Sequence, residues 1–189
     1  MKILRGAQIC LYPMPLVIVG ANVNGKPNYI TIAHVGIMDF SAISVSISKK
    51  YYTNAGIKKN KTFSMNIPSV DMVKEAEHCG LTSGKNTDKA KLFDNFYGKL
   101  QTAPMIEECP INMECKLIQT VEFPNHNVFV GEIAGTYYDD YYITNSVVDL
   151  SKVQPILFSM NDIGYWKIGE RLARAWNVEN LLGDKTTID

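Results

Sequence analysis

The segment 79–89 has the composition of an anion-binding loop and directly follows an amphipathic helical pattern. Its glycines, Gly80 and Gly84, allow the backbone to take positive φ and to present N–H groups to a ligand. Ser83 and the lysines Lys85 and Lys89 add donors and positive charge. We therefore predict that this loop holds the phosphate of a cofactor. An ordinary solvated connection has a similar composition and stays open as the alternative.

A second glycine-rich stretch, 20–26, satisfies the spacing G-x-x-x-x-G-K after an apolar run but is not predicted to bind a nucleoside triphosphate. Pro27 stands where a P-loop needs the Ser or Thr hydroxyl that holds magnesium. Asn24-Gly25 is instead typical of a tight turn between two strands. The chain also lacks G-x-G-x-x-G, so a Rossmann dinucleotide site is not expected.

Composition argues against several other classes of protein. The formal net charge of zero gives no sign of nucleic-acid or anionic-membrane partners. Neither the histidines nor the cysteines are spaced as zinc ligands, so no metal is predicted; these residues are His34, His78, His126, Cys10, Cys79, Cys109 and Cys115. Pro13 and Pro15 interrupt the N-terminal apolar run, which argues against a signal peptide. We expect a single cytoplasmic domain over residues 1–189 with reduced thiols.

The elements that would position these residues are mostly strands. Asn24-Gly25 predicts a hairpin between the runs 16–21 and 29–35, and 43–48 alternates apolar residues with serines, which places three serines on one face. Further strands are expected at 62–67, 111–117, 126–137, 141–144, 155–159 and 164–168. Gly131 is expected to mark a bulge or a close approach of the backbone.

Helices are expected to be few and short. The predicted segments are 53–59, a helix capped by Ser69 with Met72, Val73 and Ala76 on its buried face, 89–96, and part of the tail after Glu170. Several hairpin signals with only brief helices between them predict a mainly β protein, an antiparallel barrel with a few short flanking helices.

Three separated blocks together resemble the flavin reductase-like family, and most of all its flavoredoxin branch. They are residues 13–33, residues 44–68, and residues 79–89 leading to 104–110 and 126–132, with a weaker similarity at 165–170. The resemblance implies an FMN-binding split β-barrel of Greek-key type. It also implies a homodimer with FMN at the interface between its subunits.

The same resemblance assigns residues to FMN. Those that would flank the isoalloxazine are Asn28, Tyr29, Thr31 and Ala33. Those that would reach the ribityl chain and phosphate are Ser46, Ser48, Lys49 and Thr53, with Ser83, Lys85 and Lys89 completing the anion site. Cys79 is included as the first residue of the loop, although packing against the core is the reading we favour for it.

The alternatives differ among these residues. Thr31 and Ser46 would otherwise be strand residues that face solvent, and Lys85 and Lys89 would be solvated charges. In related reductases a histidine at the position of His126 lies near the nicotinamide, so His126 is the one catalytic candidate, with a backbone-bonded barrel histidine as the alternative.

Some positions depart from the family pattern. His34 stands where relatives often have tryptophan, and Asn125 replaces an acidic residue or serine before His126. Both changes bear on the electron donor. The acidic pairs Glu107-Glu108 and Asp139-Asp140 are interpreted as structural or solvated, because neighbours on a strand point apart.

Two functional hypotheses follow. The first is an FMN-dependent oxidoreductase in which NADH or NADPH passes a hydride to bound FMN, which then delivers electrons onward. The second is a flavoredoxin-like electron carrier with a redox-protein partner and no nicotinamide site. A barrel that has lost its flavin and serves as an interaction module is a third possibility.

Overall fold

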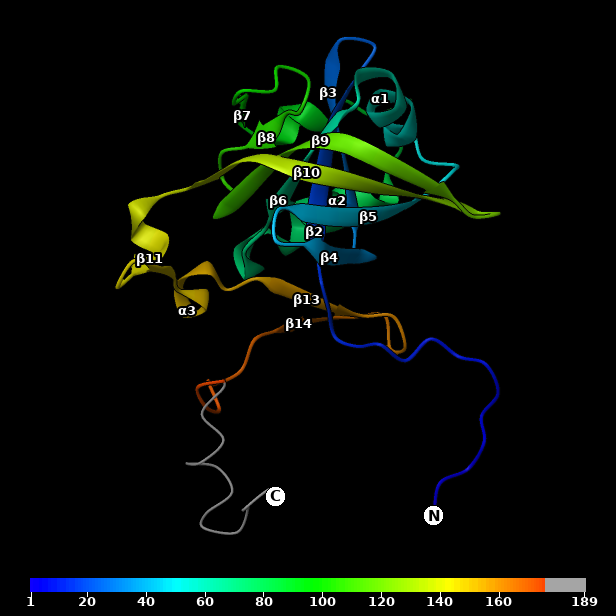
Figure 1. Cartoon of the computed structure of the whole chain (residues 1–189), viewed down its shortest axis with the longest axis vertical. Coiled ribbons are helices and arrows are strands. Elements are labelled where there is room, and N and C mark those ends of the chain that lie inside the picture. Colours follow the sequence, from blue (N-terminus) through cyan, green and yellow to red (C-terminus); the bar gives the residue numbers. More distant parts are fainter. Residues whose placement is uncertain (176–189) are drawn as a thin grey trace.

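The computed structural model describes residues 1–175, and its main element is an antiparallel sheet of seven strands in the order β3-β2-β6-β9-β10-β5-β4. The sheet curls without closing, as in a split barrel, so the mainly β prediction is confirmed (Figure 1). The strands are β2 (Val17–Val23), β3 (Lys26–Ile32), β4 (Val35–Asp39), β5 (Ala42–Ser48), β6 (Thr62–Ile67), β9 (Ile111–Glu122) and β10 (His126–Tyr138).

The predicted first hairpin is confirmed. Strands β2 and β3 pair antiparallel, with Val23 opposite Lys26. Asn24 and Gly25 have φ of 52° and 79°, the two positive values that a type I′ turn requires and that Asn and Gly tolerate best. The turn therefore fixes the register of the strand that carries Asn28.

Alternation along β5 separates the barrel interior from its outer surface, as the sequence predicts. Ile43, Val45 and Ile47 belong to the interior cluster that also contains the fully buried rings of Phe63 and Phe129. Ser44, Ser46 and Ser48 lie on the opposite face because side chains alternate across a strand. The polar strip of serines thus forms part of the outer wall.

Helix α1 (Thr53–Asn60) was predicted and packs on β2. In Figure 1, α1 and the turn between β2 and β3 lie at one end of the barrel, whereas β13 and β14 lie at the other. Helix α2 (Val73–Leu81) packs on β3 over a second apolar cluster that includes Met72, Ala76 and Cys79. The cap prediction needs correction: Ser69 precedes a 3₁₀ turn, η1 (Val70–Met72), and its side chain makes no capping hydrogen bond.

The helix expected over 89–96 is also shorter than predicted. Only η2 (Lys89–Leu92), a 3₁₀ turn, forms there, and it is followed by β7 (Asn95–Phe96), which pairs with β8 (Met105–Ile106). The side-chain amide of Asn95 donates hydrogen bonds to the Ala90 and Phe93 carbonyls. These bonds to the backbone stabilise a compact turn in place of a longer helix.

Strands β9 and β10 form the longest pair, and the expected irregularity at Gly131 is confirmed. The register shifts between Val130 and Gly131. A Cβ at Gly131 would lie 2.6 Å from the ring of Phe63 and 2.9 Å from Cβ of Cys115. Glycine is therefore needed there for close approach of the backbone to the core.

The C-terminal part adds small elements. They are η3 (Asp140–Tyr142), β11 (Ile143–Thr144), β12 (Val147–Val148), α3 (Leu150–Val153), β13 (Ile156–Ser159) and β14 (Gly164–Lys167), and β13 pairs with both β14 and β1 (Met14–Pro15). Residues 170–175 are not helical, and the rest of the predicted helical tail lies outside the described residues. None of the helices in the described part of the chain is long and apolar enough to cross a bilayer.

Candidate functional site

A buried hydrogen bond joins the first hairpin to the start of α1. Asn28 Nδ2 donates to Thr53 Oγ1 over 2.8 Å, and both side chains are buried. The bond places two predicted cofactor-binding residues, from β3 and α1, at one end of the barrel. The amides of Asn54 and Ala55 in the first turn of α1 already donate to the Tyr51 and Tyr52 carbonyls, so this end of the helix contributes mainly its dipole.

The predicted anion-binding loop packs over Asn28. A Cβ at Gly84 would collide with the Asn28 side-chain amide and lie 3.2 Å from the Tyr52 ring, so only glycine fits without displacing neighbours. Together the hairpin, the start of α1 and the loop enclose a cavity of about 380 Å³. Its lining consists of Val23, Asn24, Lys26, Pro27, Asn28, Tyr52, Gly84, Lys85, Asn86, Thr87 and Asp88.

The loop is held by its own turns. The Ser83 carbonyl accepts hydrogen bonds of 3.0 Å from the amides of both Asn86 and Thr87, and Ser83 Oγ accepts from the Lys85 amide at 3.3 Å. The side chains of Ser83 and Lys85 are exposed. Lys85 thus lies at the cavity as an exposed cation, whereas the Ser83 hydroxyl bonds within the loop.

Lys89 is placed differently from Lys85. It is 3% exposed, and its Nζ donates to the carbonyls of Cys79 and Thr82 over 3.0 and 3.1 Å. Burial lowers the pKa of the Lys89 ammonium, and the nearby Cys79 acts in the opposite direction. Lys89 therefore links the two ends of the loop, with two of its three N–H groups already committed.

Ser46 and Ser48 lie on the outer face of β5 and Lys49 follows the strand, and none of the three is among the residues that line the cavity. Ser46 and Ser48 are half-buried and Lys49 is exposed. The Ser48 carbonyl accepts from Asn54 Nδ2 over 2.8 Å, which links this strand to the first turn of α1. The structure therefore brings Ser48 and Thr53 to the same corner of the barrel.

Two histidines lie beside the serine strip. His126 is opposite Ser48 in the pairing of β10 with β5, and the His34 carbonyl accepts from the Ser46 amide over 2.8 Å. The ring centroids of His34 and His126 are 6.1 Å apart. Burial lowers the pKa of His34, and the neighbouring His126 lowers it further.

Tyr29 and Thr31 lie on the side of β3 opposite to Asn28, because successive side chains of a strand alternate, and Ala33 follows the end of this strand. Tyr29 is fully buried and donates a 2.6 Å hydrogen bond to Asn95 Oδ1. The Thr31 hydroxyl donates to the Ala76 carbonyl of α2 over 2.5 Å, and Ala33 packs on the same apolar cluster. These three side chains therefore do not gather with Asn28.

Cys79 has no exposed surface and belongs to the same cluster as Tyr29, in agreement with the packing interpretation. Burial raises the pKa of its thiol to about 11, so the uncharged form dominates at neutral pH. Any contact from Cys79 or Tyr29 to a ligand would have to come from the backbone.

Comparison with known proteins identifies the family. The family model described as "Flavin reductase like domain" matches residues 9–151, a stretch that contains every predicted site residue. The chain belongs to the flavin reductase-like family. It is similar to the flavoredoxin of Methanosarcina acetivorans, with 39% identity, TM-score 0.93, and 97% of this chain and 100% of that chain covered.

Two further relatives agree with this assignment. The flavoredoxin of Desulfovibrio vulgaris (Miyazaki F) is 34% identical, with TM-score 0.87 and coverage of 94% of this chain and 98% of that one. An FMN-binding protein of Thermus thermophilus is 20% identical, with TM-score 0.77 and coverage of 92% of this chain and 99% of that one. This likeness shows a shared fold. The resemblance to the flavoredoxin branch is therefore confirmed at the level of family and fold.

Sequence reasoning missed part of this cavity. Lys26 and Tyr52 line it, and Asn24 donates from Nδ2 to the Tyr52 hydroxyl over 3.0 Å. Sequence alone predicts only a turn at Asn24-Gly25, and it assigns no ligand contact to Lys26, which falls in a rejected P-loop spacing and in the first block of the family resemblance. Lys26 and Tyr52 are about 26 residues apart in the chain. No local sequence pattern therefore indicates that the hairpin turn forms the rim of a site.

Proposed function

We propose that this protein binds FMN with the phosphate end of the cofactor at the cavity between Asn28 and Gly84. The observation that carries the proposal is the convergence there of the α1 N-terminus, Lys26, Lys85 and the loop backbone. Helix N-termini and cations are suited to a phosphate that leaves bulk water. The similarity to two flavoredoxins over nearly the whole chain supports the same cofactor.

The residues present fit such a group. Gly84 leaves no space for a side chain over Asn28, so the loop backbone itself forms one wall. Lys89 would hold this loop closed by bonding the Cys79 and Thr82 carbonyls, which sets the position of Lys85. The half-buried Ser46 and Ser48 would offer hydroxyl partners to the ribityl chain along β5.

FMN, when bound, supplies the redox chemistry by taking electrons from a donor and passing them to an acceptor. The protein would contribute binding, orientation and electrostatics. In this proposal Lys26, Lys85 and the α1 N-terminus balance the phosphate charge, while the serine strip orients the remainder of the cofactor. No paired acid and base are required of the protein for this role.

The electron donor separates two forms of the proposal. Likeness to flavoredoxins at 39% and 34% identity favours a carrier that exchanges electrons with a redox-protein partner. The His34 and His126 pair beside Ser46 and Ser48 favours a pocket for NADH or NADPH. Anaerobic mixing of the FMN-loaded protein with each nucleotide distinguishes them, because prompt loss of the visible flavin band is expected only of a reductase.

We also propose that the chain forms the homodimer implied by its family. Strand β4 exposes Ile37 and Met38, and the following Phe40 is fully exposed. These residues lie beside an apolar cavity of about 410 Å³ at the edge of the barrel, lined also by Ile67 and Met113. Apolar surface of this kind is commonly covered by a partner, and sedimentation velocity measures the resulting mass.

The first test of the cofactor is a visible spectrum of the purified protein before and after incubation with FMN and removal of the excess. A flavin spectrum with FMN as the species released on denaturation is expected. A protein that stays colourless after reconstitution, while circular dichroism shows that it is folded, would contradict the proposal.

A further inference from the structure

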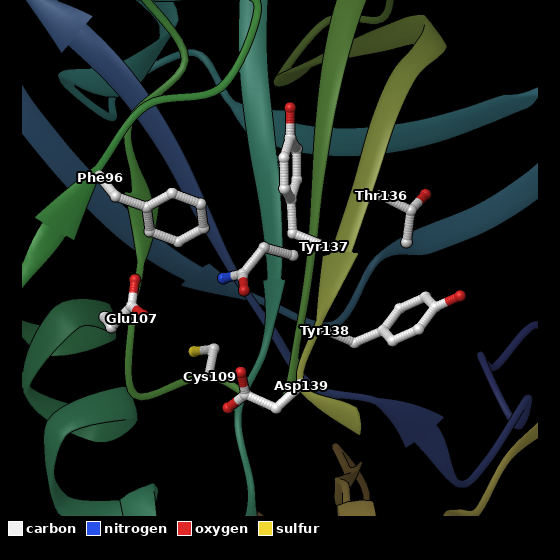
Figure 2. Close-up of a pocket in the computed structure, with 8 residues that line it drawn as sticks. Phe96, Glu107, Cys109, Thr136, Tyr137, Tyr138 and Asp139 are labelled. Atoms are coloured by element: carbon white, nitrogen blue, oxygen red, sulfur yellow. The ribbon is translucent and has the colours of Figure 1, made fainter. Parts of the chain in front are cut away.

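A third cavity, also of about 410 Å³, shares no lining residue with the Asn28 cavity or with the apolar cavity beside β4. It is bordered by β7, by the connection from β8 into β9, and by the end of β10. Figure 2 shows Phe96 and Glu107 on one side and Tyr137 and Tyr138 on the other, with Cys109 and Asp139 at the base. The lining is Phe96, Glu107, Cys109, Asn112, Thr136, Tyr137, Tyr138 and Asp139.

Aromatic rings form a fixed part of its wall. The rings of Phe96 and Tyr137 meet edge to face, with centroids 5.8 Å apart. The Tyr137 hydroxyl donates a 2.6 Å hydrogen bond to Glu114, a carboxylate with no exposed surface that also accepts from the amides of Lys99 and Leu100. This network holds Tyr137 in place, so the wall is preorganised for a ligand.

The charged lining is wholly acidic. Glu107 and Asp139 are among its lining residues, which include no lysine, arginine or histidine. Within residues 1–175 the structure has a single ion pair, Lys58 with Glu122, so neither lining carboxylate is matched by a cation of the described chain. Each belongs to an acidic pair of the sequence, and their partners Glu108 and Asp140 do not line the cavity.

A buried amide adds an acceptor. Asn112 is 3% exposed, and both of its Nδ2 hydrogens are committed, to Asn66 Oδ1 over 2.9 Å and to the Ile106 carbonyl over 2.8 Å. These two bonds fix the orientation of the amide, and Oδ1 has no hydrogen-bond donor among the described residues. This oxygen is not among the buried side-chain atoms that lack a partner, so it is open to the cavity and can accept a hydrogen bond from a ligand there.

The cavity therefore combines acceptors, negative charge and aromatic faces. The described part of the chain contains no group of three metal-ligating side chains, which argues against an inorganic ion. Aromatic faces and carboxylates together are the usual partners of ammonium and guanidinium groups. We propose that this cavity binds an organic cation, an ammonium or guanidinium group carried on an aromatic or aliphatic body.

In this arrangement Glu107 and Asp139 pair with the charge, Asn112 Oδ1 accepts one of its hydrogens, and the rings of Phe96 and Tyr137 cover the apolar body. The volume is in the range of small-molecule sites. The site is separate from the cavity proposed for the FMN phosphate, because the two share no lining residue.

Titration calorimetry of the full chain with phenethylammonium, and with the neutral 2-phenylethanol as its match, tests the proposal. We expect saturable binding of the amine and binding at least about tenfold weaker for the alcohol. A blocked arginine, N-acetylarginine amide, is the second cationic probe. Preference for the amine would indicate a free small molecule, and preference for the blocked arginine would indicate a basic side chain of another protein.

Two double variants test whether binding depends on the carboxylates that line the cavity or on negative charge nearby. E107Q/D139N should weaken binding of the amine at least about tenfold, whereas the matched control E108Q/D140N, which removes the same charge outside the cavity, should leave it unchanged. Equal losses in both double variants, equal affinity for amine and alcohol, or no saturable binding of either cationic probe below about 10 mM would overturn the proposal. Circular dichroism of both double variants confirms that each is folded.

Discussion

Asn28 and Thr53 are joined by a buried hydrogen bond of 2.8 Å, although 25 residues separate them in the chain. The bond ties the first hairpin to the first residue of α1. Gly84 then packs on the same asparagine. One amide side chain therefore sets the spacing of the three segments that would surround a phosphate.

Thr53→Val tests the energetic importance of this bond. Valine has nearly the same shape, but it leaves the Asn28 Nδ2 group buried without its acceptor, so we expect a loss of about 1–3 kcal/mol in the free energy of unfolding. Thr53→Ser keeps the hydroxyl and serves as the control. Urea denaturation of the cofactor-free protein measures both; equal midpoints for valine and wild type would show that the bond is unimportant.

Gly84→Ala tests the close packing of the loop. The added methyl group would collide with the Asn28 side chain, and the loop must move away from the cavity. We expect FMN affinity to fall by about tenfold or more, a loss of about 1.4 kcal/mol in binding free energy. Gly169→Ala is the matched control, because a Cβ there meets nothing within 4 Å. Fluorescence titration with FMN compares the two, and equal affinities would show that the loop does not contact the cofactor.

The elements predicted best from sequence are those with local signals. Asn24-Gly25 and the serine alternation of 43–48 each depend on neighbouring residues, and both appear as predicted. The residues after Lys89 gave a helical pattern, but the side chain of Asn95 bonds the Ala90 and Phe93 carbonyls and a 3₁₀ turn forms instead. Tertiary and side-chain contacts of this kind are not encoded in periodicity.

The site was predicted in part for the same reason. The residues assigned by resemblance include Asn28 and Lys85, which line the candidate cavity, but the resemblance did not reveal that Tyr29 points into the core on the other face of the same strand. Strand alternation predicts this difference, because Asn28 and Tyr29 are neighbours and their side chains must point to opposite faces. Glu114 was missed because an apolar-polar alternation predicts a solvated carboxylate, whereas loop amides from Lys99 and Leu100 cover it.

Cys79 should contribute a pH dependence to stability. Burial raises its pKa from 9.0 to about 11, so the unfolded state releases this proton first. The contribution of the protonated thiol to the free energy of unfolding is therefore fully present below pH 9.0. This contribution, up to about 3 kcal/mol, is lost as the pH rises toward 11. Cys79→Ala should flatten the fall in stability over this range relative to wild type. Urea denaturation at several pH values measures the difference, and parallel curves would contradict the assignment.

The four cysteines should differ in reactivity. Cys10 is exposed, while Cys79, Cys109 and Cys115 are buried, and burial raises the pKa of each buried thiol. Both effects suppress the reactive thiolate. An aromatic disulfide reagent should modify one thiol in the native protein and four after unfolding in guanidinium. Cys10→Ser should abolish the native reaction, and residual rapid modification in that variant would show that a core thiol is accessible.

His126→Phe tests the interaction between His126 and His34 through the pKa of His34. The aromatic side chain retains burial around His34 but removes the neighbouring charge that lowers its pKa, so the pKa of His34 should rise while remaining below 6.5, because burial still acts on it. Proton NMR titration of the imidazole C–H signals measures this shift without any cofactor. His78→Phe, which alters the remaining histidine, should leave the His34 titration unchanged.

The same variant then addresses the electron donor. If His126 shapes a nicotinamide pocket, His126→Phe should slow reduction of bound FMN by NADH or NADPH at least about tenfold, while FMN affinity stays within about twofold. If the protein instead exchanges electrons with a redox partner, neither nucleotide bleaches the wild-type flavin and the variant changes only the His34 titration. A combined loss of FMN affinity and reduction would place His126 at the cofactor itself, because the half-buried Ser48 lies opposite it in the sheet.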